Sequence, residues 1–512
     1  MANNETLVIL DYGSQYTQFI ARTAREAGVY SVVLPFNEPF KNIQKLNPLG
    51  VVLSGGPNSV YDKDAPNFDD KILGLDVPIL GVCYGLQLLA EHFGGKVAPS
   101  DVREYGRATI QVTNKSNLLV KECDKSVVWM SHGDHVAKEP KDFTVIAKSG
   151  DLIAAIQHKT KPIFGLQFHV EVTQTQKGAQ MLKNFLDICG FSYNWRPASL
   201  IQTQVPAIKK LVGKHHVICA LSGGVDSSVA ATIVAKAIGN QQTCIFVDNG
   251  LLRKNEFDDV LDMYKGLGLN IVPIRAADRF YAKLKNVTDP EKKRKIIGAE
   301  FIAIFEEEAN KIKDAKFLVQ GTLYPDVIET SRSLIGPSAS IKSHHNVGGL
   351  PEKMNLKLIE PLRDLFKDEV RALGAALGLP DAIVQRQAFP GPGLGVRIVG
   401  EITKERIKVL QNADAIVRQE IEARPDIKTS LFQYFAVLLP VKSVGVMGDH
   451  RTYEYAAAIK AFTSRDVMTA DWARLPYDLL EVMSRRIVSE VPGINRVVYE
   501  ITTKPPATIE WE

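Results

Sequence analysis

The chain has few cysteines and no excess of charge of either sign. Its 512 residues include five Cys, none of them in a Cys-x-x-Cys pair. An odd number without paired spacing predicts neither a disulfide framework nor a zinc site, and it fits a reducing compartment. Lys and Arg number 62 and Asp and Glu 58, which leaves a net charge of +4. This balance argues against a nucleic-acid-binding or membrane-binding surface.

Long apolar runs are also absent. No run approaches the roughly 20 residues that span a bilayer, and the first residues carry no basic leader. We therefore expect a cytoplasmic protein. Internal repeats and low-complexity tracts are missing too, and the chain is too long for one core, so about two to four domains are expected.

Short runs rich in Val, Ile and Leu alternate with helical patterns along most of the chain. This alternation predicts an α/β fold with a doubly wound parallel sheet, whose ligands bind at the carboxyl ends of the strands. Three domains are predicted, over residues 5–194, 195–387 and 388–512, the last a small α+β module. The predicted strands are Leu7–Leu10, Ser31–Leu34, Val51–Leu53, Ile79–Val82, Ile110–Val112, Val127–Met130, Ile163–Phe168, Val217–Leu221, Cys244–Val247, Ile271–Ile274 and Phe317–Val319.

A glycine-rich turn follows the strand predicted at Val217–Leu221. Two glycines allow the backbone to approach an anion, while Ser hydroxyls and the first helical N–H groups can cradle phosphate. The turn is not a GxxxxGK[ST] loop and no Lys follows it, so it suits a pyrophosphate that leaves as one unit better than γ-phosphoryl transfer. We expect it to bind ATP through Ser222, Gly223, Gly224, Val225, Asp226, Ser227 and Ser228.

Several acidic and polar residues can complete a nucleotide site. Asp226 is a candidate Mg²⁺ ligand, with helix capping as its alternative, and Asp248 can reach the ribose or the metal. Asp326 and Glu329 are further Mg²⁺ candidates. The polar segment 333–352 is long enough to be a lid that closes on phosphates. Its candidate contacts are Lys342, His344 and His345.

Cys83 stands between two glycines, directly after the strand predicted at Ile79–Val82. Such a frame is typical of a nucleophile elbow, which exposes its central residue at a helix N-terminus. The helix dipole and free N–H groups there favour thiolate. Cys189, Cys219 and Cys244 lie in apolar runs and are expected to be buried structural residues, whereas Cys123 lies among charges and is expected to be an incidental surface residue.

A cysteine nucleophile needs a base and a group that orients the base. His169 and Glu171 are two residues apart, and alternate residues of a strand share one face, so Glu171 can hold the imidazole of His169. The N–H groups of Gly56 and Tyr84 are candidates for an oxyanion hole. Gln87 and the segment Ser131–Asp134 can contact a substrate.

These motifs resemble two known families. The Ser222–Ser228 turn resembles the PP-loop of the N-type ATP pyrophosphatases, which split ATP into AMP and pyrophosphate to activate a carbonyl oxygen. Residues 5–194 resemble the class I glutamine amidotransferases. That resemblance implies that Cys83 attacks the amide of glutamine, His169 carries the proton, and ammonia leaves.

The whole chain resembles the bacterial glutamine-hydrolysing GMP synthase family. The segments FPGPGLGVR (389–397), VGVMGDHRTYEYA (444–456) and KPPATIEWE (504–512) carry the resemblance in the C-terminal part. It implies that ATP adenylates xanthosine monophosphate (XMP) at its C2 oxygen, that ammonia then yields GMP, and that the C-terminal domain forms a homodimer. The implied XMP residues are Arg294, Gln433, Arg496, Lys504, Thr508, Ile509 and Glu510. Residue types alone favour a terminal segment that merely packs.

Three alternatives are weighed against this interpretation. Another PP-loop glutamine-dependent amide or amine synthetase, such as an NAD synthetase, carries a glutaminase that lacks the elbow at Cys83. A PP-loop RNA-modifying enzyme fits poorly with the balanced charge and the lack of Cys-x-x-Cys pairs. A non-catalytic amidotransferase-like module does not need the set of Cys83, His169 and Glu171.

Overall fold

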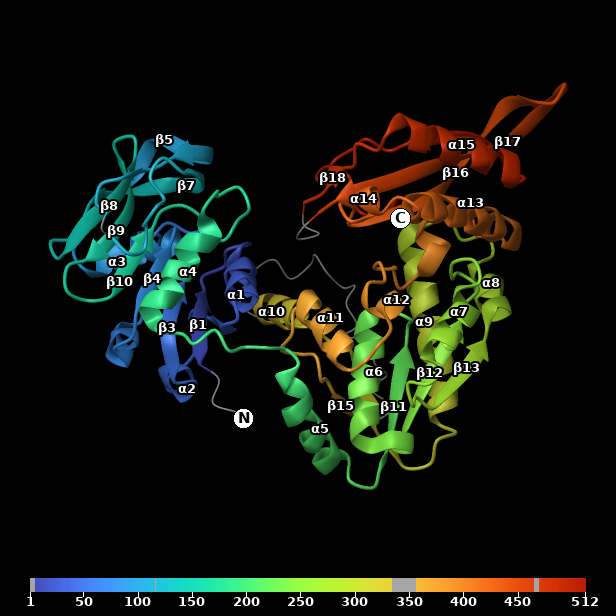
Figure 1. The fold of residues 1–512 in the computed structure, drawn as a ribbon, viewed down its shortest axis with the longest axis horizontal. Helices are drawn as coiled ribbons and strands as arrows, with labels where there is room; N and C mark the ends of the chain where they lie inside the picture. The colour runs from blue at the N-terminus through green and yellow to red at the C-terminus, as the bar shows by residue number, and fades with distance from the viewer. Residues whose placement is uncertain (1–4, 116, 334–355, 465–468) are drawn as a thin grey trace. The chain divides into compact units, whose positions relative to one another are not determined.

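A computed structural model describes residues 5–115, 117–333, 356–464 and 469–512 (Figure 1). The chain divides into two compact units, and each is considered by itself. The first comprises residues 1–203 and 323–345, and the second comprises residues 204–322 and 346–512. The boundary predicted between residues 387 and 388 falls inside the second unit.

The first unit contains an eight-stranded mixed sheet with the order β2-β1-β3-β4-β10-β9-β8-β6. The strands from β2 to β10 in this order are parallel, and β9, β8 and β6 follow antiparallel. Every residue of β1 is buried, as expected for a parallel strand covered on both faces. The bounds are β1 (Thr6–Asp11), β2 (Tyr30–Pro35), β3 (Pro48–Leu53), β4 (Ile79–Val82), β6 (Gln111–Val112), β8 (Phe143–Ser149), β9 (Leu152–His158) and β10 (Ile163–Leu166).

Helices and a second, smaller sheet complete the first unit. Strands β5 (Lys96–Thr109) and β7 (Val127–Lys138) pair antiparallel as a two-stranded sheet. The strand predicted at Val127–Met130 therefore belongs to an antiparallel ribbon, and β5, β8 and β9 are missing from the sequence-based prediction. The helices are α1 (Thr17–Glu26), α2 (Phe40–Lys45), α3 (Tyr84–His92), α4 (Gly178–Cys189) and α10 (Tyr324–Ser333).

The second unit is built on a five-stranded parallel sheet with the order β13-β12-β11-β14-β15. The chain runs outward from β11 to β13 and then returns to the other side of β11 as β14. The reversal creates a topological switch point at the carboxyl end of β11, where doubly wound sheets bind ligands. The strands are β11 (His216–Leu221), β12 (Gln242–Asp248), β13 (Ile271–Arg275), β14 (Ala315–Val319) and β15 (Lys357–Ile359).

A four-stranded sheet in the second unit joins antiparallel β16, β17 and β18 to β19, which lies parallel to β17. One face, with Tyr434, Ala457 and Ile459, shares a single hydrophobic core with Ile218 and Ile245 of the parallel sheet. This shared core explains why the two sheets form one unit. The strands are β16 (Gln433–Met447), β17 (His450–Thr463), β18 (Asp471–Trp472) and β19 (Ile494–Tyr499).

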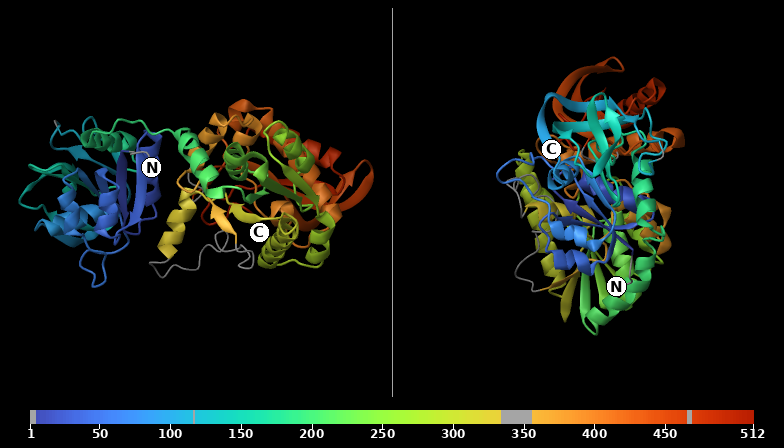
Figure 2. Two further views of the ribbon diagram at one scale, coloured as in Figure 1. Left: turned by 90° about the horizontal axis from the view of Figure 1, so that it is seen from below. Right: turned by 90° about the vertical axis from the view of Figure 1, so that its left-hand side faces the viewer.

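Helices of the second unit cover both sheets, and α13 and α15 lie along β16 and β19 (Figure 1). The tip of the β16–β17 hairpin extends beyond these helices (Figure 2), and Val446 and Tyr453 there are 78% and 65% exposed. Of the helices in the described ranges, none is long and apolar enough to cross a membrane. The helices are α5 (Ser199–Val212), α6 (Val225–Ile238), α7 (Glu256–Tyr264), α8 (Ala277–Leu284), α9 (Pro290–Ala309), α11 (Lys367–Ala376), α12 (Asp381–Val384), α13 (Lys404–Glu422), α14 (Pro425–Lys428) and α15 (Tyr477–Glu490).

Candidate active sites

Cys83 occupies a strained turn between β4 and α3. Its backbone has φ +51° and ψ −103°, and it precedes the first residue of α3. A non-glycine residue in such a conformation costs on the order of 1–3 kcal/mol, and strain of this kind clusters at functional sites. The Cys83 N–H donates to Leu166 O at 2.7 Å, which ties the turn to β10. The turn has the backbone geometry that the predicted nucleophile elbow requires.

The flanking glycines are required by packing. A Cβ on Gly85 would lie 2.3 Å from Leu53 O, and one on Gly81 would lie 2.5 Å from the carbonyl carbon of Gly85. Neither neighbour is a flexible side-chain end, so a larger residue would displace the elbow from β3. The glycine frame that marks Cys83 in the sequence is thus what lets strand, turn and helix pack together.

Replacing Gly85 by Ala is therefore expected to lower stability by about 3 kcal/mol. Gly74 has nothing within 4 Å of an added Cβ, so Gly74→Ala should change stability by less than about 0.5 kcal/mol. Chemical denaturation of both variants checks this. Equal stability of the two proteins would contradict the packing argument.

The predicted base and the carboxylate predicted to orient it lie beside the predicted nucleophile. His169 Nδ1 is 2.8 Å from Glu171 Oε1, and the thiol of Cys83 lies near enough to raise the pKa of the His169 imidazole. Burial alone would lower the pKa of His169, but Glu171 and Cys83 outweigh burial and hold that pKa well above its usual value. The structure thus brings Cys83, His169 and Glu171 together as a buried triad.

The prediction that strand alternation brings His169 and Glu171 to the same face is wrong. Strand β10 ends at Leu166, so strand alternation does not align the two side chains. Instead, His169 forms an isolated bridge with Trp129 of β7, its N–H donating to Trp129 O at 2.9 Å. Thr175 Oγ1 donates to His169 O at 2.6 Å, which fixes the turn that carries Glu171.

The raised pKa of His169 gives a pH prediction. Glu171→Gln removes the carboxylate that favours the imidazolium, so the pKa of His169 should fall. Because the reactive pair is thiolate and imidazolium, the alkaline limb of glutamine hydrolysis should move to lower pH. The maximal rate should fall by about two to four orders of magnitude. A pH profile of ammonia release tests this, and an alkaline limb at the parental pH would contradict it.

The predicted oxyanion and glutamine residues surround the triad. A Cβ on Gly55 would lie 3.1 Å from His169 Cε1, and one on Gly56 would lie 2.7 Å from Tyr12 O. This loop therefore passes beside the imidazole and needs its glycines. Gln87 Nε2 donates to Asp134 O at 3.0 Å, so Gln87 and the Ser131–Asp134 segment are in direct contact.

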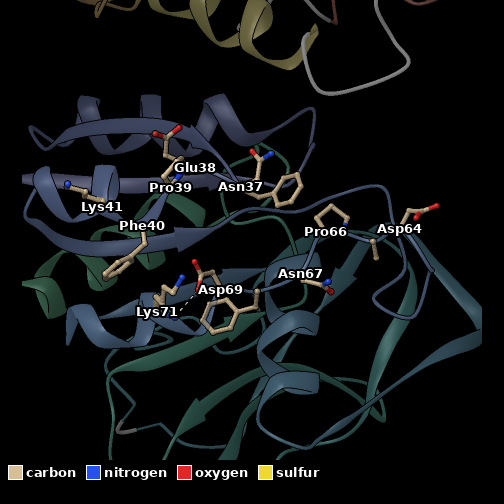
Figure 3. Close-up of a pocket in the computed structure, with 13 residues that line it drawn as sticks. Asn37, Glu38, Pro39, Phe40, Lys41, Asp64, Pro66, Asn67, Asp69 and Lys71 are labelled. Carbon is tan, nitrogen blue, oxygen red and sulfur yellow. Dashed lines mark hydrogen bonds between the residues drawn. The ribbon is translucent and has the colours of Figure 1, made fainter.

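An open pocket of about 720 Å³ lies elsewhere in the first unit (Figure 3). Phe40, Pro66 and Asp69 line it, with Lys71 N–H donating to Asp69 Oδ1 at 3.0 Å. No residue of the triad borders it. Tyr84 OH, from the elbow, donates to Pro66 O in the lining of this pocket at 2.7 Å. The pocket supplies no group to the predicted chemistry.

The predicted PP-loop lies at the switch point of the parallel sheet, between β11 and α6. Gly223 has φ +73°, a conformation that favours glycine. Ser222 Oγ and Ser227 Oγ are 3.0 Å apart and can both face an anion. Ser228 differs, because its Oγ bonds Gly224 O at 2.7 Å and Tyr264 OH at 2.6 Å. Ser228 therefore anchors the loop rather than lining its mouth.

The structure brings cations to this loop that its own sequence lacks. Lys367, the first residue of α11, forms an ion pair with Asp226 Oδ2. The other oxygen of Asp226, Oδ1, is buried and has no hydrogen-bond partner among the described residues. A carboxylate oxygen of this kind is a suitable ligand for Mg²⁺, which usually takes one or two carboxylates and completes its shell with phosphates and water.

Of the other residues predicted at the ATP site, the structure describes the side chains of only some. Asp248 ends β12, and its Oδ1 accepts from Gly250 N at 2.9 Å. Asp326 accepts from Leu323 N at 2.9 Å at the start of α10. Lys342, His344, His345 and the side chain of Glu329 lie outside the described residues. Within the described part of the chain, no three His, Cys, Asp or Glu side chains gather to hold a metal.

The C-terminal segment packs onto the outer face of the four-stranded sheet. Alternation and strand register place Gln433, Lys460 and Arg496 on that face. Ile509 packs there against a small buried cluster that includes Phe435. Lys460 Nζ donates to Thr508 O at 2.7 Å and holds the segment onto the sheet. The residues predicted to bind XMP, on the strands of this sheet and in the C-terminal segment 504–512, are thus parts of one surface.

Glu510 is held by a buried arginine. Arg397 is fully buried and donates to Glu510 through Nε and Nη2, both at 2.9 Å. The guanidinium carbon lies 3.8 Å from the ring centroid of Phe435. Such a bidentate pair fixes the carboxylate in position, and its outer lone pairs can still accept hydrogen bonds.

Other residues predicted to bind XMP also have defined hydrogen-bond partners. Arg294 donates to the Glu512 carbonyl oxygen, and Gln433 Nε2 donates to Ala388 O at 2.9 Å. Arg496 Nε donates to Ser443 Oγ at 3.2 Å, and Lys504 forms a backbone bridge with Ala470. The C-terminal segment 504–512 thus contacts Arg294 through Glu512 and Arg397 through Glu510, and it lies on the face of the sheet that carries Gln433 and Arg496.

The structure adds Lys367, Arg397, Lys293 and Lys460 to the site residues predicted from the sequence. Lys293 is fully buried and pairs with Glu512, and burial lowers the pKa of Lys293. Buried cations are rare and are usually paired, but only tertiary structure reveals their burial. Arg397 ends the segment FPGPGLGVR, so its sequence position is the one signal that was available.

Comparisons with known proteins agree with this arrangement. Family models described as "Glutamine amidotransferase class-I", "NAD synthase" and "GMP synthase C terminal domain" match residues 8–189, 200–301 and 419–511. Together with the mixed sheet of the first unit and the parallel sheet of the second, they confirm the predicted fold class.

Three bacterial relatives are named glutamine-hydrolysing GMP synthase. The protein of Clostridium kluyveri is 53% identical over 99% of this chain and 99% of its own length. That of Fusobacterium nucleatum is 55% identical, again over 99% of each chain. That of Geobacillus kaustophilus is 54% identical over 100% of each.

Proposed function

Because the chain belongs to the glutamine-hydrolysing GMP synthase family, we propose that it aminates XMP to GMP with ammonia from glutamine and energy from ATP. The observation that carries the proposal is the buried triad of Cys83, His169 and Glu171 in the same chain as a lysine-free PP-loop. One site can release ammonia, and the other can activate an acceptor oxygen.

In the first reaction, the Cys83 thiolate attacks the amide carbon of glutamine. The N–H groups of Gly56 and Tyr84 are the proposed donors to the oxyanion. His169, oriented by Glu171, gives its proton to the leaving nitrogen, and ammonia departs. Water then cleaves the thioester with His169 as base, which releases glutamate and restores the thiolate.

In the second reaction, the C2 oxygen of XMP attacks the α-phosphorus of ATP. The bond between the α-phosphorus and the bridging oxygen breaks, and pyrophosphate leaves along the PP-loop. Ammonia then attacks C2, loses a proton, and AMP departs with the former C2 oxygen. Mg²⁺ supplies charge neutralisation on the phosphates when bound, and Asp226 fits as its ligand through the unpartnered Oδ1 described above.

The proposal also covers the XMP-binding surface, the oligomeric state and the cellular location. We assign the base and phosphate of XMP to the surface formed by Gln433, Arg294 and the tail residues 504–510, with Glu510 accepting from base N–H groups. Asp248 is assigned to the nucleotide. The protein is proposed to act as a cytoplasmic homodimer on small-molecule substrates. The C-terminal family match favours XMP over the acceptor of another PP-loop synthetase.

The proposal is tested by supplying ATP, Mg²⁺, glutamine and XMP together. GMP, AMP, pyrophosphate and glutamate should accumulate in equal amounts. Ammonium should replace glutamine at raised concentration. A product set containing ADP and phosphate, or no GMP with either nitrogen source, would overturn the proposal.

Glu510→Gln is expected to raise the KM for XMP about tenfold, because a neutral amide accepts less strongly from the base and pairs less strongly with Arg397. Glutamine hydrolysis by Cys83 should be unaffected. Steady-state kinetics with varied XMP check this, and Trp511→Phe, next in the chain, is the matched control. An unchanged KM for XMP would remove Glu510 from the acceptor site.

A further inference from the structure

An arginine outside the PP-loop lies against it. An added Cβ on Gly223 would be 3.4 Å from Arg386 Nη1, so this nitrogen is a close neighbour of the loop backbone. Arg386 follows α12 and is far from the loop in sequence. Both belong to the second unit. The loop therefore has a guanidinium at its side, although no cation is present within its own seven residues.

The other terminal nitrogen of this guanidinium, Nη2, is held by an ion pair. Arg386 Nη2 forms an ion pair with Glu256 Oε1, and Glu256 is buried at the start of α7. The second oxygen of Glu256 accepts from Arg253 N at 2.7 Å. The Arg386 carbonyl accepts from Arg371 Nη2 at 3.3 Å. These contacts fix the side chain from its backbone to its tip.

The edge that faces the loop has no partner. Arg386 Nη1 is buried, and no acceptor bonds it among the described residues. A buried cationic N–H group without an acceptor is costly, because it has lost water and gained nothing in exchange. Such a group is satisfied when an anion enters the loop. Guanidinium donors suit phosphate oxygens, which accept in the same plane.

We propose that Arg386 is a further pyrophosphate-binding residue, whose Nη1 donates to an oxygen of the β- or γ-phosphate of ATP. It takes the place of the lysine that the loop lacks. Its contact persists when the bond between the α- and β-phosphates breaks, so it stabilises the negative charge that builds up on the leaving pyrophosphate. The inference rests on the proposed cleavage of ATP to AMP and pyrophosphate.

The competing role is purely structural: Arg386 anchors the segment before Phe389 to α7 through Glu256. The two roles differ in what they bind. A pyrophosphate ligand affects the affinity for pyrophosphate and ATP but hardly affects AMP, which lacks the β- and γ-phosphates. A structural anchor affects all three alike, or none.

The test measures binding of inorganic pyrophosphate and of AMP, each with Mg²⁺, to the full-length protein by calorimetry. Arg386→Gln should weaken pyrophosphate binding about ten- to a hundredfold, as expected for loss of a charged hydrogen bond, and AMP binding by less than about threefold. Arg386→Lys, which keeps the charge and the pairing with Glu256, should recover part of the loss. Unchanged pyrophosphate affinity, or an equal loss for AMP, would overturn the inference.

Arg371→Gln is the matched control. Arg371 anchors the same segment through the carbonyls of Val384 and Arg386, so its loss loosens the segment without removing the guanidinium. Its pyrophosphate affinity should stay within about threefold of the parent. A loss equal to that of Arg386→Gln would show anchoring alone and contradict the inference. Wild-type production of AMP and pyrophosphate, measured in parallel, separates failure of this inference from failure of the proposed function.

Discussion

Replacing Cys83 by Ala is expected to reduce glutamine-dependent GMP formation at least a thousandfold while leaving ammonia-dependent formation intact. Loss of the nucleophile removes the covalent step, and the remaining groups cannot substitute for it, so a loss of about this size or more is expected. The second unit retains its complete PP-loop, because Cys83 belongs to the first unit. Rates with glutamine and with ammonium chloride, measured on one preparation, give both values.

A second cysteine supplies the control for Cys83→Ala. Cys189 ends α4, and burial raises the pKa of its thiol, so it remains protonated and unreactive. Cys189→Ala should therefore keep both activities within about threefold of the parent. Loss of ammonia-dependent synthesis in Cys83→Ala would contradict the division of labour between the two sites. Full glutamine-dependent activity in that variant would remove Cys83 from the mechanism.

Asp226→Ala is expected to lower GMP formation at least a hundredfold with either nitrogen source. It removes the unpartnered Oδ1 that fits Mg²⁺ and leaves Lys367 without its carboxylate partner. Several kcal/mol of charge stabilisation on the phosphates depends on such a metal. Pyrophosphate release in the presence of ATP and XMP is the direct readout, and glutamine hydrolysis should continue.

Asp278→Ala provides a comparison for Asp226→Ala. Asp278 lies on α8, its side chain is 87% exposed, and it pairs with Lys404 at the surface. Pyrophosphate release should stay near the parental rate in this variant, because exposed pairs contribute little. Parental pyrophosphate release by Asp226→Ala would remove that residue from ATP chemistry.

The sequence allowed prediction of the features that depend on local geometry. Gly81 and Gly85 flank Cys83 because an added Cβ on Gly85 would meet the backbone of Leu53 and one on Gly81 would meet the backbone of Gly85, so the elbow is visible in the five consecutive residues 81–85. The PP-loop is equally local, since Gly223 needs its positive φ and Asp226 follows within the first turn of α6. Buried parallel strands such as β1 also appear as continuous apolar runs.

Features that depend on distant contacts could not be predicted in this way. The spacing of His169 and Glu171 indicates a pair, but the bridge to Trp129 that aligns them needs β7, which is far away in sequence. Arg386 and Lys367 reach the PP-loop only after the chain returns past β14 and β15. Their local sequences are ordinary helical or loop surroundings, so no motif marks them.

The C-terminal surface shows the same limit. Glu510 was assigned from a family resemblance, since its segment alone predicts only packing. The structure adds a physical reason, because the buried Arg397 fixes the Glu510 carboxylate against the sheet that carries Gln433. Arg397 is separated from Glu510 by most of the C-terminal region, and no periodicity links the two residues.

The proposed mechanism requires that ATP activates the C2 oxygen of XMP by adenylation. It is tested most directly with XMP that carries oxygen-18 on C2. If ammonia displaces AMP as proposed, the label must appear in the phosphate of AMP, one labelled AMP for each GMP formed. Mass spectrometry of the AMP measures this ratio. Label recovered in pyrophosphate, inorganic phosphate or water, with unlabelled AMP, would contradict the account.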